Sequence, residues 1–356
     1  MSRQPTTEQV ARRSDRMRAV VNYEPERVDL REVDVPEIDE GEALIRVEAV
    51  GICGSDVHQW HGSHSWDVNY PVTLGHEFGG VVEEIEGSGE FAPGDRVVSE
   101  TAAEIDETSP LSRRGLYNLD PSREGFGYGT DGAMARYVAV PVRCLHHIPD
   151  ELPFERAALT EPCSVAYNAV CENADVDPGE SVLVIGPGPI GLLCVQMAVL
   201  AGASTVIASG LPADRDRLDV AEELGATHAV TGDPAGVIDD VGDGLGVDTV
   251  IDASGVSAAL ETAMEAVRPD GHITKVGWGP QPMEYSMDPV VQKAVTVQGS
   301  FSHTWPVWER VITLLDTGQL DVEPIVDRVA PLEAWRECFE GMHDREYIKC
   351  VLTPSA

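Results

Sequence analysis

The sequence predicts an α/β protein with two unlike parts: a mostly-β, barrel-like domain and a domain built on a doubly wound parallel sheet. The chain has 356 residues, which is long for one compact core, so two domains are expected. Residues 17–150 carry short alternating strand patterns with few helical periods. From residue 180 onward, apolar runs of strand length alternate with helical segments, as in a parallel sheet covered by helices.

Strand patterns and turns follow one another through the first part. Apolar and polar residues alternate in the manner of strands over residues 19–21 and 42–47. Residues 79–82 continue this pattern, and the turn at residues 93–95, Pro-Gly-Asp, precedes a further strand at residues 96–98. Because long helical periods are few here, we expect a barrel-like arrangement.

Strand and helix alternate through the second part. Strands are expected at residues 181–185, 204–208, 248–252 and 272–276, and helices at residues 190–200, at residues 214–224 and between the last two strands. Two closing helices at residues 305–315 and 332–339 and a last strand at residues 347–352 end the chain. This order predicts a parallel, doubly wound sheet.

The charge of the chain is strongly negative. There are 61 acidic and 25 basic side chains, which gives a net charge of −36, and the acidic residues are spread along the whole sequence. The simpler interpretation is the solvated surface of an acidic enzyme. A salt-adapted source is favoured, because the excess is large and uniform and high salt screens self-repulsion. Such a field repels phosphate backbones, so nucleic acid is not expected as a partner.

Cysteine usage and hydropathy indicate a cytoplasmic location. Seven scattered cysteines form no disulfide framework and fit a reducing compartment. No apolar run approaches the roughly 20 residues of a membrane span, so no membrane association is expected. Residues 1–16 are polar, and no apolar stretch follows Arg12-Arg13, so we expect a loose extension and no export signal.

Candidate metal ligands gather in one short stretch. Cys53, His76 and Glu77 supply a thiolate, an imidazole and a carboxylate, which are the ligand types that zinc takes. A catalytic zinc also keeps one coordination position open.

A glycine-rich turn follows the apolar strand at residues 181–185. It reads Gly186-Pro187-Gly188-Pro189-Ile190-Gly191 and opens a helix, which is the context of a dinucleotide-binding turn. Its glycines would let the backbone approach a pyrophosphate at the helix N-terminus. A metal site and a nicotinamide site in one chain indicate hydride transfer from an alcohol.

The end of the next strand bears on the choice of nicotinamide. NAD enzymes usually place an acid here to bind the ribose 2′-hydroxyl, but this chain has Ser209-Gly210. Arg215 and Arg217 follow, and arginine can hold a 2′-phosphate. The sequence therefore favours NADP over NAD, unless both arginines simply face solvent.

Several spaced motifs together resemble the zinc-dependent medium-chain alcohol dehydrogenases, and within them the polyol (sorbitol-type) branch. They are Cys-Gly-Ser-Asp-Val-His at residues 53–58, Gly-His-Glu at 75–77, Glu-Pro-Cys-Ser at 161–164, the glycine turn and Thr-Trp-Pro-Val at 304–307. The resemblance implies a GroES-like catalytic domain and a Rossmann domain. The domain boundaries that we expect are 1–16 for the extension, 17–165 for the zinc-binding catalytic domain, 166–302 for the Rossmann domain and 303–356 for a segment that completes the catalytic domain.

The same resemblance implies the ligands of one catalytic zinc per chain. Cys53 and His76 match two ligands, and Glu77 matches a carboxylate that binds the metal or lies beside it. Glu161 falls where the polyol branch has a glutamate. Cys163 competes with Glu161 as a thiolate ligand, and its alternative role is core packing.

Further residues of the motif match roles in proton transfer and orientation. Asp56 matches an acid that would accept a hydrogen bond from His76 and fix its tautomer. Ser55 and His58 match a relay that carries the alcohol proton toward solvent, while zinc acts as a Lewis acid on the alcohol oxygen. The alternatives are that Ser55 caps a helix and that His58 is an ordinary surface residue.

One lobe of the catalytic domain departs from the family pattern. Relatives often carry a second, structural zinc on four cysteines, but here the corresponding positions are Asp106, Ser109, Ser112 and Asp120. Hydroxyls and carboxylates make a poor tetrahedral zinc site. We therefore expect no structural zinc and a remodelled lobe.

The resemblance implies a small-molecule substrate, namely the secondary hydroxyl of a polyol, sugar or sugar acid. The segment 301–304 lacks the Arg-Tyr pair of sorbitol-type enzymes, which argues against sorbitol itself, and Trp60, His64 and His303 are candidates for the pocket wall. A homodimer or homotetramer is implied, with residues 294–301 pairing across subunits. The alternatives are a threonine-type or simple alcohol dehydrogenase, and, more remotely, a catalytically inactive cofactor-binding protein.

Overall fold

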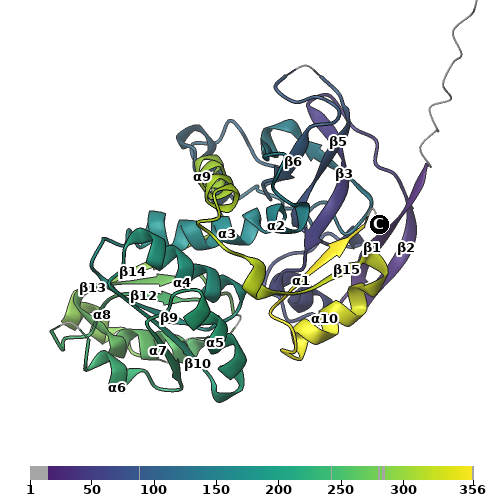
Figure 1. Cartoon of the computed structure of the whole chain (residues 1–356). Helices are drawn as coiled ribbons and strands as arrows, with labels where there is room; N and C mark the ends of the chain where they lie inside the picture. The colour runs from purple at the N-terminus through teal and green to yellow at the C-terminus, as the bar shows by residue number, and fades with distance from the viewer. Residues whose placement is uncertain (1–14, 88, 242, 280, 283–284, 355–356) are drawn as a thin grey trace, which may run out of the picture.

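The computed structural model describes residues 15–87, 89–241, 243–279, 281–282 and 285–354 (Figure 1). The expected N-terminal extension at residues 1–16 lies almost wholly outside the described residues, and the first strand already begins at Arg16. Among the described residues, no helix is both long and apolar enough to cross a membrane.

Two β-sheets of different kinds dominate the molecule. The barrel-like half contains a seven-stranded sheet, in which β15-β16-β3-β5-β6-β8 are neighbours in that order and β7 also pairs with β3, and a three-stranded sheet of order β2-β1-β4. The strands are β1 Arg16–Glu24, β2 Arg27–Asp34, β3 Glu42–Gly51, β4 Val72–Thr73, β5 Glu77–Ile85, β6 Arg96–Ser99, β7 Tyr137–Pro141, β8 Leu145–His147, β15 Val326–Pro331 and β16 Lys349–Thr353. Most pairs are antiparallel, as expected for the barrel-like half.

The other half is built on six parallel strands in the order β11-β10-β9-β12-β13-β14. These strands are β9 Ser181–Ile185, β10 Thr205–Gly210, β11 His228–Thr231, β12 Val247–Asp252, β13 Val267–Lys275 and β14 Thr296–Gly299. The helices around them are α4 Pro189–Ala201, α5 Arg215–Glu223, α6 Ala235–Ile238, α7 Ser257–Ala266 and α8 Asp288–Lys293. The doubly wound parallel sheet is therefore confirmed.

Helices α2 and α3 lie between the two halves, and α9 packs beside α3 (Figure 1). The remaining helices are α1 Gly54–Trp60, α2 Phe154–Ala157, α3 Thr160–Tyr167, α9 Trp305–Asp316 and α10 Trp335–His343. Single 3₁₀ turns span Ser112–Arg114, Tyr117–Leu119, Val142–Cys144, Pro212–Asp214, Glu323–Ile325 and Leu332–Ala334, and a π-helix spans Asn168–Asn173.

Burial of their side chains on both faces explains why the central strands of the parallel sheet could be predicted from apolar runs in the sequence. All five residues of β9 are buried, because helices cover both faces of the parallel sheet. Other predicted boundaries shift by a few residues. The helix expected at residues 332–339 is a 3₁₀ turn followed by α10, and the strand expected at 272–276 begins earlier, at Val267.

The last strand brings the end of the chain to the centre of the catalytic sheet. β16 pairs antiparallel with β3, with Val351 opposite Gly51, and the Ile52 amide donates to the Cys350 carbonyl at 3.0 Å. On its other side β3 pairs with β5, with Gly51 opposite Glu77. The side chains of Lys349, Cys53 and Glu77 are therefore supplied by neighbouring strand ends.

Candidate active site

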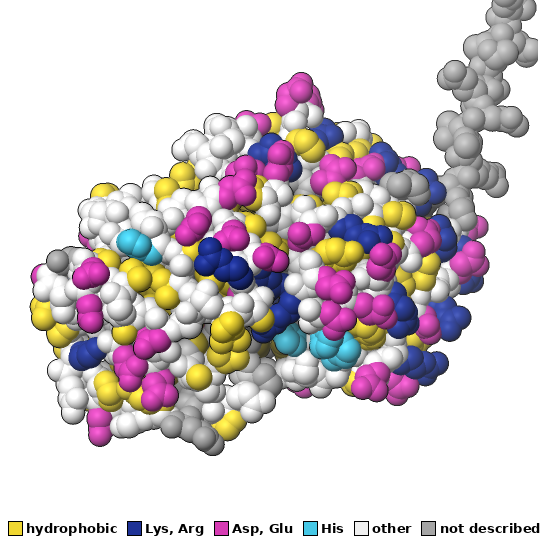
Figure 2. All heavy atoms as spheres, turned by 60° about the horizontal axis from the view of Figure 1, so that its bottom comes forward, with side chains coloured by type: hydrophobic (Ala, Val, Ile, Leu, Met, Phe, Trp, Pro, Cys, Tyr) yellow, Lys and Arg dark blue, Asp and Glu magenta, His cyan; other side chains and the backbone are white. Residues whose placement is uncertain are grey.

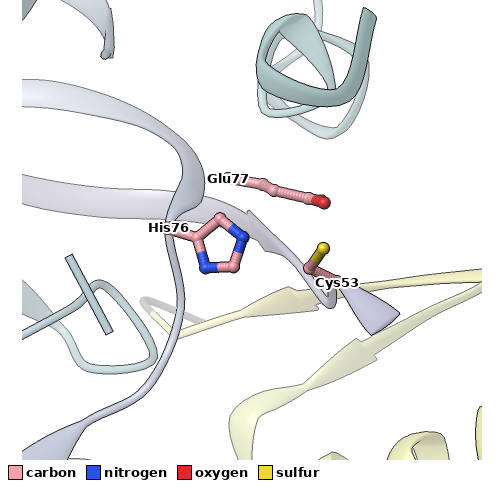
Figure 3. Close-up of side chains that lie close together, drawn as sticks. All are labelled: Cys53, His76 and Glu77. Carbon is pink, nitrogen blue, oxygen red and sulfur yellow. The ribbon is translucent and has the colours of Figure 1, made fainter. Parts of the chain in front are cut away.

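Three side chains converge where β3 ends and β5 begins. One ligand atom from each of Cys53, His76 and Glu77 lies within 4.8 Å of the other two, and Figure 3 shows the sulfur, the ring and the carboxylate facing one another. Glu77 is fully buried, while Cys53 and His76 are partly accessible. A thiolate, an imidazole and a carboxylate fit zinc. The buried Glu77 Oε2 accepts no well-aligned hydrogen bond from the described residues, although Lys349 Nζ lies 2.5 Å from it.

Two glycines allow this convergence. Gly51 lies opposite Glu77, and a Cβ at this position would overlap Glu77 Oε2. Gly75 has a φ of 98°, which L side chains rarely adopt, and a Cβ there would come within 2.7 Å of the Met134 side chain. Glycine at positions 51 and 75 therefore leaves the space in which Glu77 and Met134 pack beside the turn.

A buried lysine accompanies Glu77. Lys349 Nζ donates to Glu77 Oε1 at 2.6 Å, and Lys349 is 1% exposed. Burial raises the pKa of Glu77, although the charge of Lys349 opposes this. Lys349 could not be predicted from the sequence, because it is 272 positions from Glu77 and nothing in the local pattern connects the two residues.

His76 lies between an acid and a hydroxyl. Its Nδ1 is 3.6 Å from Asp56 Oδ1, and its Nε2 is 3.5 Å from Ser55 Oγ. The first distance is longer than the hydrogen bond that the sequence predicted, and the other Asp56 oxygen instead accepts from the Cys53 amide at 2.9 Å. Burial disfavours the imidazolium, but the Asp56 carboxylate outweighs this and raises the pKa of His76 well above 6.5.

Glu161 and Cys163 both lie outside the group of three ligand atoms. Glu161 is nearly buried, and its Oε1 is 3.1 Å from His303 Nε2. Burial would raise the pKa of Glu161, but the hydrogen bond from His303 and the charges of His76 and Lys349 lower it. Cys163 is fully buried in the apolar core, and burial raises the pKa of its thiol.

The three candidates for the pocket wall have different surroundings. Trp60 packs in the core against Trp335 and Phe339, and His303 is 2% exposed, so neither forms an open pocket surface. His64 contacts Trp66 with ring centroids 5.3 Å apart.

A row of aromatic side chains continues from Trp66 to the other domain. Trp66 meets Trp278 edge-on at 5.8 Å, and Trp278 contacts Phe301 at 5.7 Å. Trp278 is 55% exposed, so an aromatic surface that the sequence analysis missed extends from the Trp66 loop of the catalytic domain to the loop that follows β13.

His58 belongs to a group of four histidines. Its Nδ1 is 3.0 Å from Ser63 Oγ. The His58 side chain is accessible, but partial desolvation of its ring lowers the pKa of His58, and His343, His61 and His64 lower it further as neighbouring positive charges. The His61 and His343 rings lie 4.1 Å apart, so α10 contributes directly to the surroundings of the predicted relay.

The glycine turn has the geometry of a dinucleotide site. Gly186 has a φ of 96°, and a Cβ there would crowd Ser254 at 2.9 Å. Gly191 packs against the Gly186 carbonyl, where a Cβ does not fit. Gly188 precedes α4, whose first residue is Pro189 and whose second is Ile190, so the turn ends at a helix N-terminus, the kind of backbone site that binds phosphate in other proteins.

At the end of β10 acidic and basic side chains lie together. Ser209 donates to the Gly232 carbonyl at 3.1 Å, and Gly210 ends the strand. The nearby acid, Asp214, accepts from the Leu211 amide at 2.9 Å and pairs with Arg345 at 3.2 Å. The Asp214 carboxylate is thus already bonded to a backbone amide and to Arg345. Arg345, like Arg215, is a cation near this strand end, but the sequence alone did not indicate it.

Arg215 and Arg217 differ in their availability. Arg215 is exposed and pairs with Asp219 at 3.1 Å on the same helix. Arg217 donates to the Tyr347 carbonyl at 3.1 Å, which ties it to the C-terminal segment.

The lobe that lacks cysteine is held by hydrogen bonds. Ser109 donates to an oxygen of Asp120 and lies 3.2 Å from the Ser112 hydroxyl, and Ser122 donates to the other Asp120 oxygen at 2.6 Å. Asp106 instead accepts from Thr108. Three of the four positions expected from the family pattern are therefore together in space.

Comparisons with known proteins agree with this geometry. Residues 39–150 match the alcohol dehydrogenase GroES-like domain, and residues 189–317 match the zinc-binding dehydrogenase domain. The chain is 35% identical to the sorbitol dehydrogenase of Halalkalibacterium halodurans over 87% of this chain and 91% of that protein. It is 34% identical to the L-threonine 3-dehydrogenase of Pyrococcus furiosus over 92% and 96%. The structure of a zinc-binding dehydrogenase from Sinorhizobium meliloti 1021 bound to NADP matches with a TM-score of 0.88 and 30% identity, covering 96% of this chain and all of that one.

Proposed function

Because this chain belongs to the zinc-dependent medium-chain alcohol dehydrogenase family, we propose that it oxidises a secondary alcohol of a polyol, sugar or sugar acid with a nicotinamide cofactor. The observation that carries this proposal is the convergence of Cys53, His76 and Glu77 in a chain that matches both a GroES-like and a zinc-binding dehydrogenase domain. These donors are the set that a catalytic zinc requires.

Cys53, His76 and Glu161 are the proposed ligands of one zinc per chain, and Glu77 is proposed to bind the metal in place of Glu161 or to lie beside it, so that one position stays open for the substrate. When bound, zinc would act as a Lewis acid on the substrate oxygen, and the nicotinamide would take up the hydride. Asp56 lies beside Nδ1 of His76, which leaves Nε2 directed toward the other ligands. Glu77 is kept ionised at this buried position by Lys349.

The proton of the alcohol is proposed to leave through Ser55 and His58. The Ser55 hydroxyl lies next to the ligand group, 3.5 Å from His76 Nε2. His58 lies one helical turn further along α1 and is exposed, so it can pass a proton to solvent. Its lowered pKa keeps the ring neutral, and therefore able to accept a proton, at neutral pH.

NADP is the proposed cofactor. The amide groups around Gly188 and Gly191 would hold the pyrophosphate. Gly210 supplies no acid for a ribose hydroxyl, and Arg215 and Arg345 flank the same strand end. The similarity to an NADP-bound structure supports this choice.

The lobe around Asp120 is proposed to need no structural zinc. Ser109, Ser112 and Ser122 are hydrogen-bonded to one another or to Asp120, so the cross-link that a metal would supply is made by hydroxyls and a carboxylate. Tyr117 also connects this lobe to the rest of the catalytic domain, because its hydroxyl donates a hydrogen bond to Glu100 at 2.6 Å.

A homodimer, or a tetramer built from such dimers, is proposed through the edge strand β14. This strand ends the six-stranded sheet, its four residues are exposed, and Val297 is 40% exposed. Nearby Val291 is 83% exposed. Unpaired backbone groups beside apolar side chains favour continuation of the sheet into a second copy.

A salt-adapted enzyme of the cytoplasm is the proposed setting. Acidic side chains are spread over the face seen in Figure 2 rather than collected in one patch, in keeping with the net charge of −36. The seven cysteines are free thiols, which fits a reducing compartment.

A threonine-type dehydrogenase is the second candidate, and the similarity to the Pyrococcus furiosus enzyme favours it. A panel of polyols, aldoses, sugar acids and L-threonine, tested with NADP and with NAD, separates the two. Highest kcat/KM on a polyol, sugar or sugar acid supports the first proposal, and highest kcat/KM on threonine supports the second. Absence of turnover together with absence of bound zinc would leave only a cofactor-binding protein.

A further inference from the structure

Three buried side chains form a chain of hydrogen bonds that ends at Glu161. Glu161 comes from α3, His303 from the segment before α9, and Trp308 from α9 itself. His303 Nε2 lies 3.1 Å from Glu161 Oε1, and Trp308 Nε1 lies 2.6 Å from His303 Nδ1. Their exposed fractions are 7%, 2% and 0%. The three groups are therefore coupled in an environment with little water.

The order of donors and acceptors along this chain follows from the indole. An indole N–H can only donate, so His303 Nδ1 must accept and carries no proton. The single proton of the neutral imidazole is then on Nε2, where it is donated to Glu161. Trp308 therefore fixes the tautomer of His303, and the charged form of His303 would break the bond to Trp308.

This arrangement leaves one carboxylate oxygen of Glu161 for another partner. Glu161 Oε1 accepts from His303, while no bond to Oε2 is recorded among the described residues. Both oxygens of Glu77, in contrast, lie within 2.6 Å of Lys349 Nζ. Of the two carboxylates near Cys53 and His76, Glu77 is thus held by an ammonium group at both oxygens, whereas within the described part of the chain Glu161 has a hydrogen-bond partner at Oε1 alone.

We propose that His303, with its tautomer fixed by Trp308, is a positioning residue that holds Glu161 so that its second oxygen can bind the metal beside Cys53 and His76. This inference rests on the proposed zinc site and adds the reason why Glu161, rather than the core thiol Cys163, completes it. The closing helix α9 is thereby connected to the metal centre through side chains alone.

The test compares zinc affinity in purified full-length variants by competition with a chromogenic chelator, without reference to turnover. His303→Leu removes the donor and should weaken zinc binding by roughly 10- to 100-fold. His303→Gln, which keeps an N–H near the Nε2 position, should restore most of the affinity. Trp308→Phe should weaken binding by a smaller factor, because the imidazole loses its fixed tautomer but keeps its place.

Three further measurements separate a positioning role from simple loss of packing. Trp335→Phe removes a buried indole elsewhere in the catalytic domain and should leave zinc affinity unchanged. In a Glu161→Gln background, His303→Leu should have little additional effect, because the carboxylate that it positions is gone. The absorption spectrum of the cobalt-substituted protein should change with His303→Leu and return toward the native form with His303→Gln.

The outcomes distinguish this inference from the proposed function. Tight zinc binding in the native protein with affinity unchanged by His303→Leu would overturn the role of His303 and leave the zinc enzyme intact. If His303→Leu weakened zinc binding by the same factor in the native protein and in the Glu161→Gln background, the role of His303 would also be overturned. A native protein that binds no zinc would overturn the proposed metal site itself.

Discussion

Lys349 Nζ lies 2.6 Å from Glu77 Oε1 and 2.5 Å from Glu77 Oε2, and both residues are almost completely buried. The proposed metal centre and its immediate surroundings include three anionic groups, namely Cys53, Glu77 and Glu161. A divalent ion would neutralise two of these charges, and the ammonium of Lys349 neutralises the third. The lysine thus balances the charges of these three groups when zinc is bound, which lowers the cost of burying them together.

Replacement of Lys349 by methionine is predicted to destabilise the fold by about 3–5 kcal/mol, the range for breaking one partner of a buried ion pair. The length of the side chain is kept, so the loss reports the charge rather than a cavity. Burial already raises the pKa of Glu77, and without Lys349 it should rise further. Urea unfolding monitored by circular dichroism gives the free energy, and Lys349→Arg is the control that keeps the charge. A loss below about 1 kcal/mol would contradict this account.

Cys53→Ala is predicted to reduce bound zinc from about one ion per chain to less than a tenth of that, together with activity, because thiolate is the strongest zinc ligand of the group. Cys163→Ala is the matched control, since Cys163 lies in the apolar core and its pKa is raised by burial. Elemental analysis of both variants after dialysis against a mild chelator measures the difference. Zinc lost from the Cys163 variant instead would reassign the fourth ligand to that thiol.

Local patterns predicted the parts of this molecule that depend on local sequence. The strand at residues 181–185 and the glycine turn that follows it could be placed because burial on both faces produces an unbroken apolar run, and because a φ of 96° at Gly186 requires glycine. Cys53 and His76 could be identified as a pair because their flanking motifs are specific.

Contacts between distant segments could not be predicted in this way. Lys349 reaches Glu77 only because β16 pairs with β3, and Arg345 reaches Asp214 from the turn before β16.

The position of His303 also differs from the prediction. His303 was expected at the pocket wall, but it is buried between Glu161 and Trp308, which are 142 and 5 positions away in the sequence. Such pairs leave no periodic signal, since they are decided by how the domains close on each other.

Arg215→Ala is predicted to weaken NADP binding roughly tenfold and to leave NAD binding unchanged. A charge-assisted hydrogen bond to a 2′-phosphate is worth about 1.5 kcal/mol at an exposed position, which corresponds to that factor. Arg345→Ala should act in the same direction, although it also frees Asp214. Fluorescence titration with both nucleotides provides the measurement, and NAD serves as the control within each variant. Equal weakening of both nucleotides would indicate that Arg215 acts on the fold and not on the phosphate.

Salt is predicted to stabilise the protein through screening. With 61 acidic and 25 basic side chains, the folded surface repels itself, and the screening length falls from roughly 10 Å at 0.1 M to roughly 3 Å at 1 M salt. We expect the melting temperature to rise steeply between about 0.05 and 0.5 M KCl. Sucrose at matched water activity is the control for general exclusion effects. A melting temperature that responds to sucrose and KCl alike would remove the argument for screening.

The pH dependence of turnover is predicted to follow His58. Burial first, and then His343, His61 and His64, lower the pKa of His58, so the ring stays neutral below the ordinary value of 6.5. A relay that accepts the alcohol proton works only while His58 is neutral. The acid limb of kcat/KM for alcohol oxidation should therefore lie below pH 6.5, and activity should be lost as pH falls through the lowered pKa of His58.

His343→Gln tests this assignment, because it removes one of the neighbouring charges that oppose protonation of His58. The pKa of His58 should rise, and the acid limb should move to higher pH. The free energy of unfolding provides an independent test. Below pH 6.5 the unfolded chain binds a proton at His58 more readily than the folded chain, so the free energy of unfolding falls as the pH drops through this window. The fall should be smaller in the His343→Gln variant. His147→Gln, at an exposed ring stacked on Phe91, is the control. An acid limb that stays in place, or moves to lower pH in His343→Gln, would show that His58 does not carry the proton.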